Sequence, residues 1–283
     1  MLYKTTTFVC VVIGATLSTA RADTDPNTEP ATNATAAVEG ADQLTLPQGR
    51  LLLDAFVEIN LSDGAVFKPF SISPDVWYGA TPELTVGLVH SAVGASGFIG
   101  GVGTALCLSG SANGCGDVYP GVGVEARYKL TTGMLAWAAD GGLYVRHFDP
   151  FQLAIKIGAA GRWHSGPLAV EVTPNLFFGV TNRAPAAMGT VVVTTNEEIL
   201  NLPVTALYSV IPKAQVALQV GVVLPFQNAG DTFAIPLSIG GHYQATADLN
   251  VNLAFSLPLL AGGSLQPTGV DARTLTLGGT YAF

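Results

Sequence analysis

Apolar and polar residues alternate along most of this chain with a period of two. Between Leu51 and Ile59 the odd positions are apolar, whereas Asp54, Glu58 and Asn60 occupy even positions. Because successive side chains of a β-strand point to opposite faces, this alternation predicts a strand whose two faces differ chemically. The same pattern predicts twelve strands, near residues 50–61, 68–79, 83–93, 118–130, 133–148, 151–164, 167–181, 198–211, 213–225, 232–244, 248–258 and 273–283.

One face of these predicted strands is apolar and free of charge, and the other is polar but carries few charges. Their lengths of about 11 to 16 residues exceed the ~5–6 residues usual in globular sheets, and match with some overhang the ~9–11 residues that cross a bilayer. A soluble sandwich would instead show many lysines and glutamates on its polar face. The apolar face is therefore expected to meet lipid.

A helical membrane protein is the alternative that an apolar chain raises. The longest stretch without Asp, Glu, Lys or Arg covers residues 84–116, but it is rich in glycine and its apolar residues form short, broken groups. No span of about 18 predominantly apolar, glycine-poor residues follows residue 22. The sequence therefore favours membrane-spanning strands over membrane-spanning helices.

Aromatic residues at the strand ends test this interpretation independently. If the mature N-terminus is periplasmic, the even-numbered strands run towards the periplasm, and each should end in an aromatic residue at the lipid interface. All six predicted ends are aromatic and fall on the lipid-facing side of their strands. This predicted aromatic girdle comprises Tyr78, Tyr128, Trp163, Tyr208, Tyr243 and Phe283.

The final strand, residues 275–283, ends in Phe283, and the segment 78–88 is similar to a hairpin common among bacterial surface barrels. On these features the chain resembles a Gram-negative outer-membrane β-barrel over residues 49–283, at the level of architecture only. The resemblance implies an all-β, antiparallel up-and-down barrel of about twelve strands, with ten or fourteen if residues 92–117 or 182–200 are misread. It also implies lipid contact in the outer membrane and recognition of Phe283 by the barrel-assembly machinery.

Two segments precede the predicted barrel. Residues 1–22 carry Lys4, an apolar run and the sequence Ala20-Arg21-Ala22, a pattern typical of a cleaved signal peptide. Residues 23–48 hold five acids, no bases and few large apolar side chains, so they cannot bury enough surface to offset the entropy of ordering. We expect a flexible, acidic periplasmic lead-in, with a plug or a partner-binding peptide as the alternative.

Composition narrows the classes of function. Charged residues make up 11% of the chain, well below the ~25% of ordinary soluble domains, and the net charge is −8. A cytosolic enzyme is therefore disfavoured, and so is binding to nucleic acid, whose phosphates would be repelled. After Cys10 leaves with the signal peptide, Cys107 and Cys115 are expected to form a structural disulfide. Their spacing fits no zinc pattern, and we expect no metal and no cofactor.

The polar face would line the interior of the barrel. Its many glycines and alanines predict a partly hollow lumen, although glycine can also serve to bend a barrel. The charges could sort solutes by a transverse field, or they could pair into a network that fills the interior. The predicted lining charges are Asp54, Glu58, Asp75, Glu125, Arg127, Lys129, Asp140, Arg146, Lys156, Arg162 and Glu171.

A narrow, passive, porin-like channel for small solutes is the function that these features favour. A structural or surface-binding barrel without conductance is the first alternative, because residues 94–117, 182–197 and 259–271 form long loops; the first of these could instead fold into the barrel and narrow it. A transporter of small hydrophobic molecules is the second, because Phe56, Trp77 and Phe177 would place aromatic surface on the inner wall.

A lipid hydrolase is disfavoured. Such an enzyme needs a nucleophile with a base within hydrogen-bond reach, and the adjacent His–Ser pairs are His90-Ser91 and His164-Ser165. Neighbours on a strand point to opposite faces, and the chain contains no G-x-S-x-G motif. The sequence therefore predicts that the protein is not an enzyme.

Overall fold

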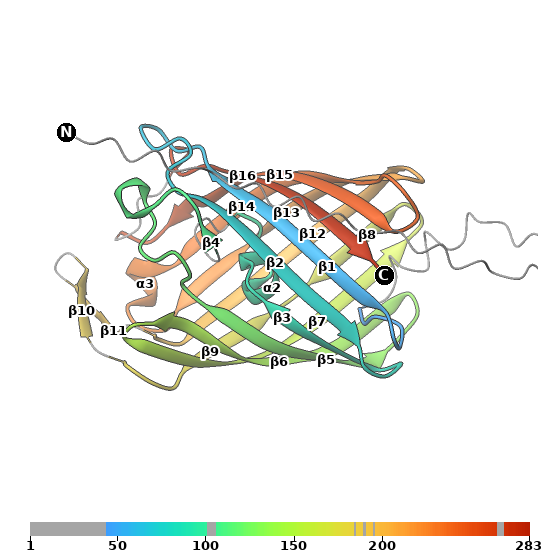
Figure 1. Cartoon of the computed structure of the whole chain (residues 1–283), viewed down its shortest axis with the longest axis horizontal. Helices are drawn as coiled ribbons and strands as arrows, with labels where there is room; N and C mark the ends of the chain where they lie inside the picture. Colours follow the sequence, from blue (N-terminus) through green and yellow to red (C-terminus); the bar gives the residue numbers. More distant parts are fainter. Residues whose placement is uncertain (1–43, 101–105, 184, 189–190, 195, 265–268) are drawn as a thin grey trace, which may run out of the picture.

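The computed structural model describes residues 44–283 apart from 101–105, 184, 189–190, 195 and 265–268. Within this part of the chain, antiparallel strands close into one barrel with twelve strand positions (Figure 1). The predicted signal peptide and residues 23–43 of the lead-in lie outside the described residues. The barrel strands are β1 (Leu51–Asn60), β2 (Phe70–Gly79), β3 (Leu84–Val89), β5 (Val122–Thr131), β6 (Leu135–Phe148), β7 (Phe151–Ser165), β8 (Leu168–Val172) in line with β9 (Asn175–Gly179), β12 (Ile199–Ile211), β13 (Ala214–Pro225), β14 (Ala234–Gln244), β15 (Leu249–Gly262) and β16 (Thr274–Ala282).

The first strand closes the barrel by pairing on both of its edges. Asp54 of β1 lies opposite Asp75 of β2 on one side and opposite Thr280 of β16 on the other. This pairing closes the sheet on itself, as a lipid environment requires. The predicted fold class and the count of twelve strands are confirmed.

Short turns join the strands at one end of the barrel, and longer connections join them at the other. We call these the turn end and the loop end; they lie to the right and to the left in Figure 1. The loop end carries β4 (Leu106–Cys107), the 3-10 turn η1 (Ser111–Asn113), the hairpin β10 (Pro185–Met188) and β11 (Val191–Thr194), and the short helix α3 (Ala229–Thr232). The hairpin falls in the predicted loop 182–197.

Two predicted strands differ from the structure. The strand expected over residues 167–181 is split at Thr173 and Pro174, because proline has no N–H to donate to the ladder. The strand expected over residues 83–93 ends at Val89 and is followed by the helix α2 (Ala92–Ser96). The second difference is the more important one, because it places chain inside the barrel.

The outer face of the wall is apolar. Large side chains along the strands are strongly exposed, as Val124 at 60% and Ile239 at 61% illustrate. At the turn end Tyr78, Tyr128, Tyr208, Tyr243 and Phe283 are exposed, and Trp163 is half-buried. An apolar band edged by aromatic residues is the surface that a barrel presents to lipid. Among the described residues, no helix is both long and apolar enough to cross a membrane.

The inward glycines provide room for aromatic rings. A Cβ on Gly87 would lie 2.3 Å from the ring of Trp77, and a Cβ on Gly123 would lie 2.2 Å from the ring of Tyr144. Both rings are buried and belong to one apolar cluster on the inner wall with Val89, Ala154 and Phe177. At these two positions glycine therefore neither widens the lumen nor serves only to bend the barrel, because a ring lies flat against the wall there.

Candidate functional site

Strand β3 leaves the barrel wall at mid-height, and β4 later occupies the same position beside β2. β3 pairs with β2 up to Val76 opposite Leu88, and β4 pairs with the same edge of β2 through Ile72 opposite Leu106. The chain between Val89 and Leu106 is thus an excursion from one strand line. We call its described part, residues 90–100, the inner segment; it contains α2, which lies within the barrel (Figure 1).

A buried carboxylate turns the chain inwards. The Asp75 carboxylate accepts the backbone N–H groups of His90 at 2.7 Å and Ser91 at 2.8 Å, and also the Ser91 hydroxyl. The Ser91 Oγ in turn accepts the Gly94 N–H at 2.8 Å and so caps α2. The sequence placed Asp75 among the charges that line the lumen. In the structure its carboxylate anchors the inner segment.

The far wall holds the inner segment through polar side chains. Asn175 Nδ2 donates to the Ser96 carbonyl at 2.8 Å, and Gln219 donates to the Gly97 carbonyl at 2.8 Å while accepting the Ile99 N–H at 2.9 Å. Irregular backbone inside a membrane barrel needs such partners, because unpaired N–H and C=O groups are costly. Three further donors complete the crossing, namely Lys156 to Gly94, Ser238 to Ile99 and Thr274 to Gly100. The inner segment therefore spans the lumen from β3 to β16.

A charged network lies beside the inner segment. Lys156 Nζ is 2.8 Å from the Glu125 carboxylate and 3.4 Å from that of Asp140, and Arg127 is 3.3 Å from Asp140. Tyr144 donates its hydroxyl to Glu125. Because Lys156 also donates to the inner segment, the network and the segment form one hydrogen-bonded unit. Of the two arrangements considered from the sequence, the structure contains the paired one at these four charges.

The other predicted lining charges lie apart from this network. Glu58 accepts hydrogen bonds from Ser71 and Ser73, both at 3.0 Å. Arg162 pairs with Glu171 across neighbouring strands at 2.9 Å. Lys129 lies at the turn end, where it donates to the Pro82 carbonyl at 2.6 Å. Arg146 lies towards the loop end. Asp54 lies on the wall between Asp75 and Thr280 of the neighbouring strands.

The disulfide connects the two sides of the loop that follows the inner segment. Cys107 and Cys115 are joined, and Cys107 lies opposite Ser71 on β2. The loop thus returns to the wall at a cross-linked point. Nothing in the sequence marked the polar residues that hold the inner segment from the wall, namely Asn175, Gln219, Ser238 and Thr274.

The end of the lead-in also enters the barrel. The Leu46 N–H donates to Thr85 Oγ1 at 2.7 Å, Thr45 is buried, and Leu46 packs against the cluster that contains Trp77. The lead-in predicted over residues 23–48 thus ends in residues that lie against the inner wall at the turn end.

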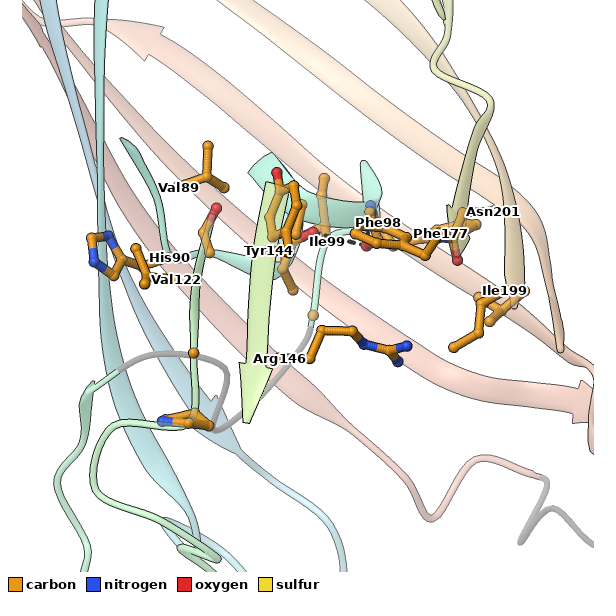
Figure 2. A pocket seen from close by; sticks show the side chains of 18 of the residues that line it. Val89, His90, Phe98, Ile99, Val122, Tyr144, Arg146, Phe177, Ile199 and Asn201 are labelled. Carbon is orange, nitrogen blue, oxygen red and sulfur yellow. Dashed lines mark hydrogen bonds between the residues drawn. The ribbon is translucent and has the colours of Figure 1, made fainter. Parts of the chain in front are cut away.

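A cavity of about 450 Å³ lies between the inner segment and the loop-end half of the wall. In Figure 2, Phe98 and Ile99 of the inner segment lie across from Val122 and Ile199 of the wall, with Arg146 reaching between them. Near Arg146, at the loop end, burial raises the pKa of the Glu197 carboxyl, an effect that the Gln227 N–H and the Arg146 charge partly offset.

His90 and Ser91 form no hydrolase dyad, and no metal centre is assembled in the part of the chain that the structure describes. The His90 ring contacts the Pro74 carbonyl and the Tyr119 hydroxyl, whereas the Ser91 hydroxyl is bonded to Asp75, so the two side chains do not meet. No group of three or more His, Cys, Asp or Glu residues there is placed to hold a metal ion.

Comparison with known proteins places the fold. No family model matches the sequence, and no curated protein matches it. Three solved structures share the architecture across nearly their whole length. They are the NanC porin (TM-score 0.55, 10% identity, 81% of this chain and 98% of that chain), the KdgM porin (0.52, 8%, 82% and 99%) and an outer-membrane channel from Pseudomonas putida F1 (0.52, 14%, 84% and 97%). This chain has the fold of outer-membrane porins.

A glycine substitution in the inner segment tests how tightly the far wall holds it. Gly97 has φ +82°, and a Cβ there would lie 2.5 Å from Thr173 Oγ1 and 2.8 Å from Pro203. Gly97→Ala should therefore push the segment off the wall and change the single-channel conductance. Gly110→Ala is the matched control, because Gly110 has φ +84° but no atom within 4 Å of its Cβ position. Equal effects of the two variants on conductance would mean that backbone strain, not contact with the wall, is responsible.

Proposed function

We propose that this protein is a passive channel of the outer membrane whose pore is narrowed by the inner segment. The observation that carries the proposal is the crossing of the lumen by residues 90–100, held at both walls, beneath a cavity of about 450 Å³. A twelve-stranded barrel is wider than the ~8-stranded ones that side chains alone can fill. The crossing segment is what reduces that interior to a narrow path.

The narrow path would select solutes by size and by polarity. At mid-height the solute passes the paired charges of Glu125, Lys156, Asp140 and Arg127, which present both signs within a few ångströms. Paired charges hold water and small polar solutes without binding either ion strongly. The likeness to the NanC and KdgM porins supports this function, since both are porins of the same fold.

Swelling of liposomes tests passive permeation directly. The mature protein would be refolded into liposomes and exposed to neutral sugars of increasing mass. We expect swelling with the smallest sugars that falls steeply with size, because the constriction limits entry. Liposomes that fail to swell with any solute, although the protein is folded and inserted, would contradict the proposal and favour a structural or surface-binding barrel.

Insertion into the outer membrane is proposed to depend on Phe283. Its ring stacks edge-on against Tyr281 at 4.7 Å between centroids, is exposed on the outer face, and its N–H donates to the Leu51 carbonyl at 2.9 Å. Phe283→Ala should lower the amount of folded protein in the outer membrane several-fold in cells, yet leave refolding into liposomes little changed. Phe255→Ala on the same outer face is the control. Equal losses for both variants would contradict recognition of Phe283 by the assembly machinery.

A further inference from the structure

We propose that the cavity at the loop end binds a small amphiphilic monoanion, a ligand with one carboxylate on an apolar body. The inference rests on the proposed function, because it names the class of solute that the channel takes up. It stands on the composition of the cavity wall and on the placement of one arginine.

The wall of the cavity is mostly apolar. Phe98 and Ile99 contribute from the inner segment, and Val122, Phe177 and Ile199 contribute from β5, β9 and β12 (Figure 2). Pockets of about 300–1,000 Å³ with an apolar lining and a few placed polar groups are the usual sites for small molecules. At about 450 Å³, this cavity accommodates a body of one or two rings or a medium alkyl chain.

Arg146 provides the polar contact. Its Nη1 donates to Asn196 Oδ1 at 3.4 Å and to the Glu197 carbonyl at 3.3 Å, both uncharged acceptors, and its guanidinium carbon lies 5.9 Å from the centre of the Phe177 ring. Figure 2 shows the side chain extending into the cavity. A guanidinium beside apolar surface is well suited to hold a carboxylate through two parallel hydrogen bonds.

Arg146 differs in its partners from three other cations of the lumen. Lys156, Arg127 and Arg162 each lie within ion-pair distance of a carboxylate. Among the described residues, no carboxylate lies within such a distance of Arg146. Glu197 lies near enough for its charge and that of Arg146 to interact, but the two side chains form no ion pair. A partly buried guanidinium that no carboxylate contacts favours an anionic ligand, whose carboxylate replaces the water that the guanidinium loses.

The surroundings of the cavity also indicate how many charges the ligand carries and how polar the rest of the ligand is. Lys156 on the inner wall is already neutralised by Glu125 and Asp140, so it offers no partner to a second negative charge. A sugar would place many hydroxyls against Val122, Ile199 and Val223, which offer no side-chain hydrogen bonds. One negative charge on an apolar body satisfies both conditions.

Calorimetric titration of the refolded mature protein in detergent tests this site without requiring conductance. The probes are 4-phenylbutyrate, its neutral counterpart 4-phenylbutyramide, and acetate, which has the charge but no body. We expect binding of 4-phenylbutyrate at least about tenfold tighter than of either analogue, as a charge-assisted bond and apolar burial predict. Arg146→Gln should remove that preference, whereas Arg183→Gln, which alters an exposed pair with Glu198, should keep it.

The possible outcomes separate the proposed site from the proposed channel. Equal affinity for 4-phenylbutyrate and the amide, or an unchanged preference in Arg146→Gln, would overturn the proposal and favour a site for neutral hydrophobic molecules. If Arg146→Gln fails to fold, Ile199→Ser serves instead. This variant should weaken the binding of 4-phenylbutyrate and leave the binding of acetate unaltered. Binding of 4-phenylbutyrate with no sugar-induced swelling of liposomes would support the proposed site and contradict the proposed channel. Swelling without binding would support the channel and contradict the site.

Discussion

Deleting residues 92–105 will raise the single-channel conductance several-fold and leave the barrel folded. The deletion places Leu106 directly after Ser91, and the pairings of β3 and β4 with β2 then form one unbroken ladder, with Leu106 opposite Ile72. The wall is thus repaired while the crossing segment is removed. Planar-bilayer recordings of the two refolded proteins provide the comparison.

A deletion one residue shorter is the control. Removing residues 92–104 shifts the register by one, so each side chain beyond the junction would turn to the opposite face of the wall. Cys107 and the residues after it would then be misplaced, and we expect that protein to fold poorly. A conductance unchanged by the in-register deletion would show that the inner segment does not limit the pore.

Replacing Lys156 with Met will lower the free energy of unfolding by roughly 3–5 kcal/mol, the usual cost of removing one partner from a buried ion pair. The Lys156 side chain is 2% exposed and that of Glu125 is 0% exposed, so without Lys156 the two buried carboxylates, Glu125 and Asp140, would share Arg127 alone. Urea unfolding of the protein in phospholipid vesicles, followed by tryptophan fluorescence, measures the change.

The double variant Lys156→Met with Glu125→Gln separates the charge effect from packing. Because the charge that needs a partner is removed together with the partner, we expect the double variant to recover much of the stability that the single variant loses. A double variant as unstable as the sum of the two single variants would mean that Glu125 and Lys156 act independently.

The sequence predicted the wall well because lipid imposes a simple rule on it. Every second side chain must be apolar, so alternation located the strands, and the ends at Tyr78 or Tyr243 followed from the interface. The pattern failed to show that the strand ends before His90, because the apolar residues Ala92 and Val93 still looked like part of a strand. The hydrogen bonds that Asp75 accepts from His90 and Ser91 connect one strand with the end of the next, so no local pattern in the sequence indicates them.

The interior was harder to predict than the wall for the same reason. Strand parity placed Glu125 and Lys156 on one face, but their pairing depends on the heights of separate strands. The partners of the inner segment are more distant still, since Gln219 is over a hundred residues from Gly97 in the chain. The cavity beside Arg146 exists only because the segment lies there, so it could not be predicted without that contact.

Single-channel conductance of the unaltered mature protein tests the central claim most directly. The refolded chain would be inserted into a planar bilayer and recorded across a range of salt concentrations. A narrow pore crossed by the inner segment predicts stable, discrete steps of small amplitude. A folded, inserted barrel that gives no steps would contradict the claim, because the inner segment and the charged network would then close the lumen rather than narrow it.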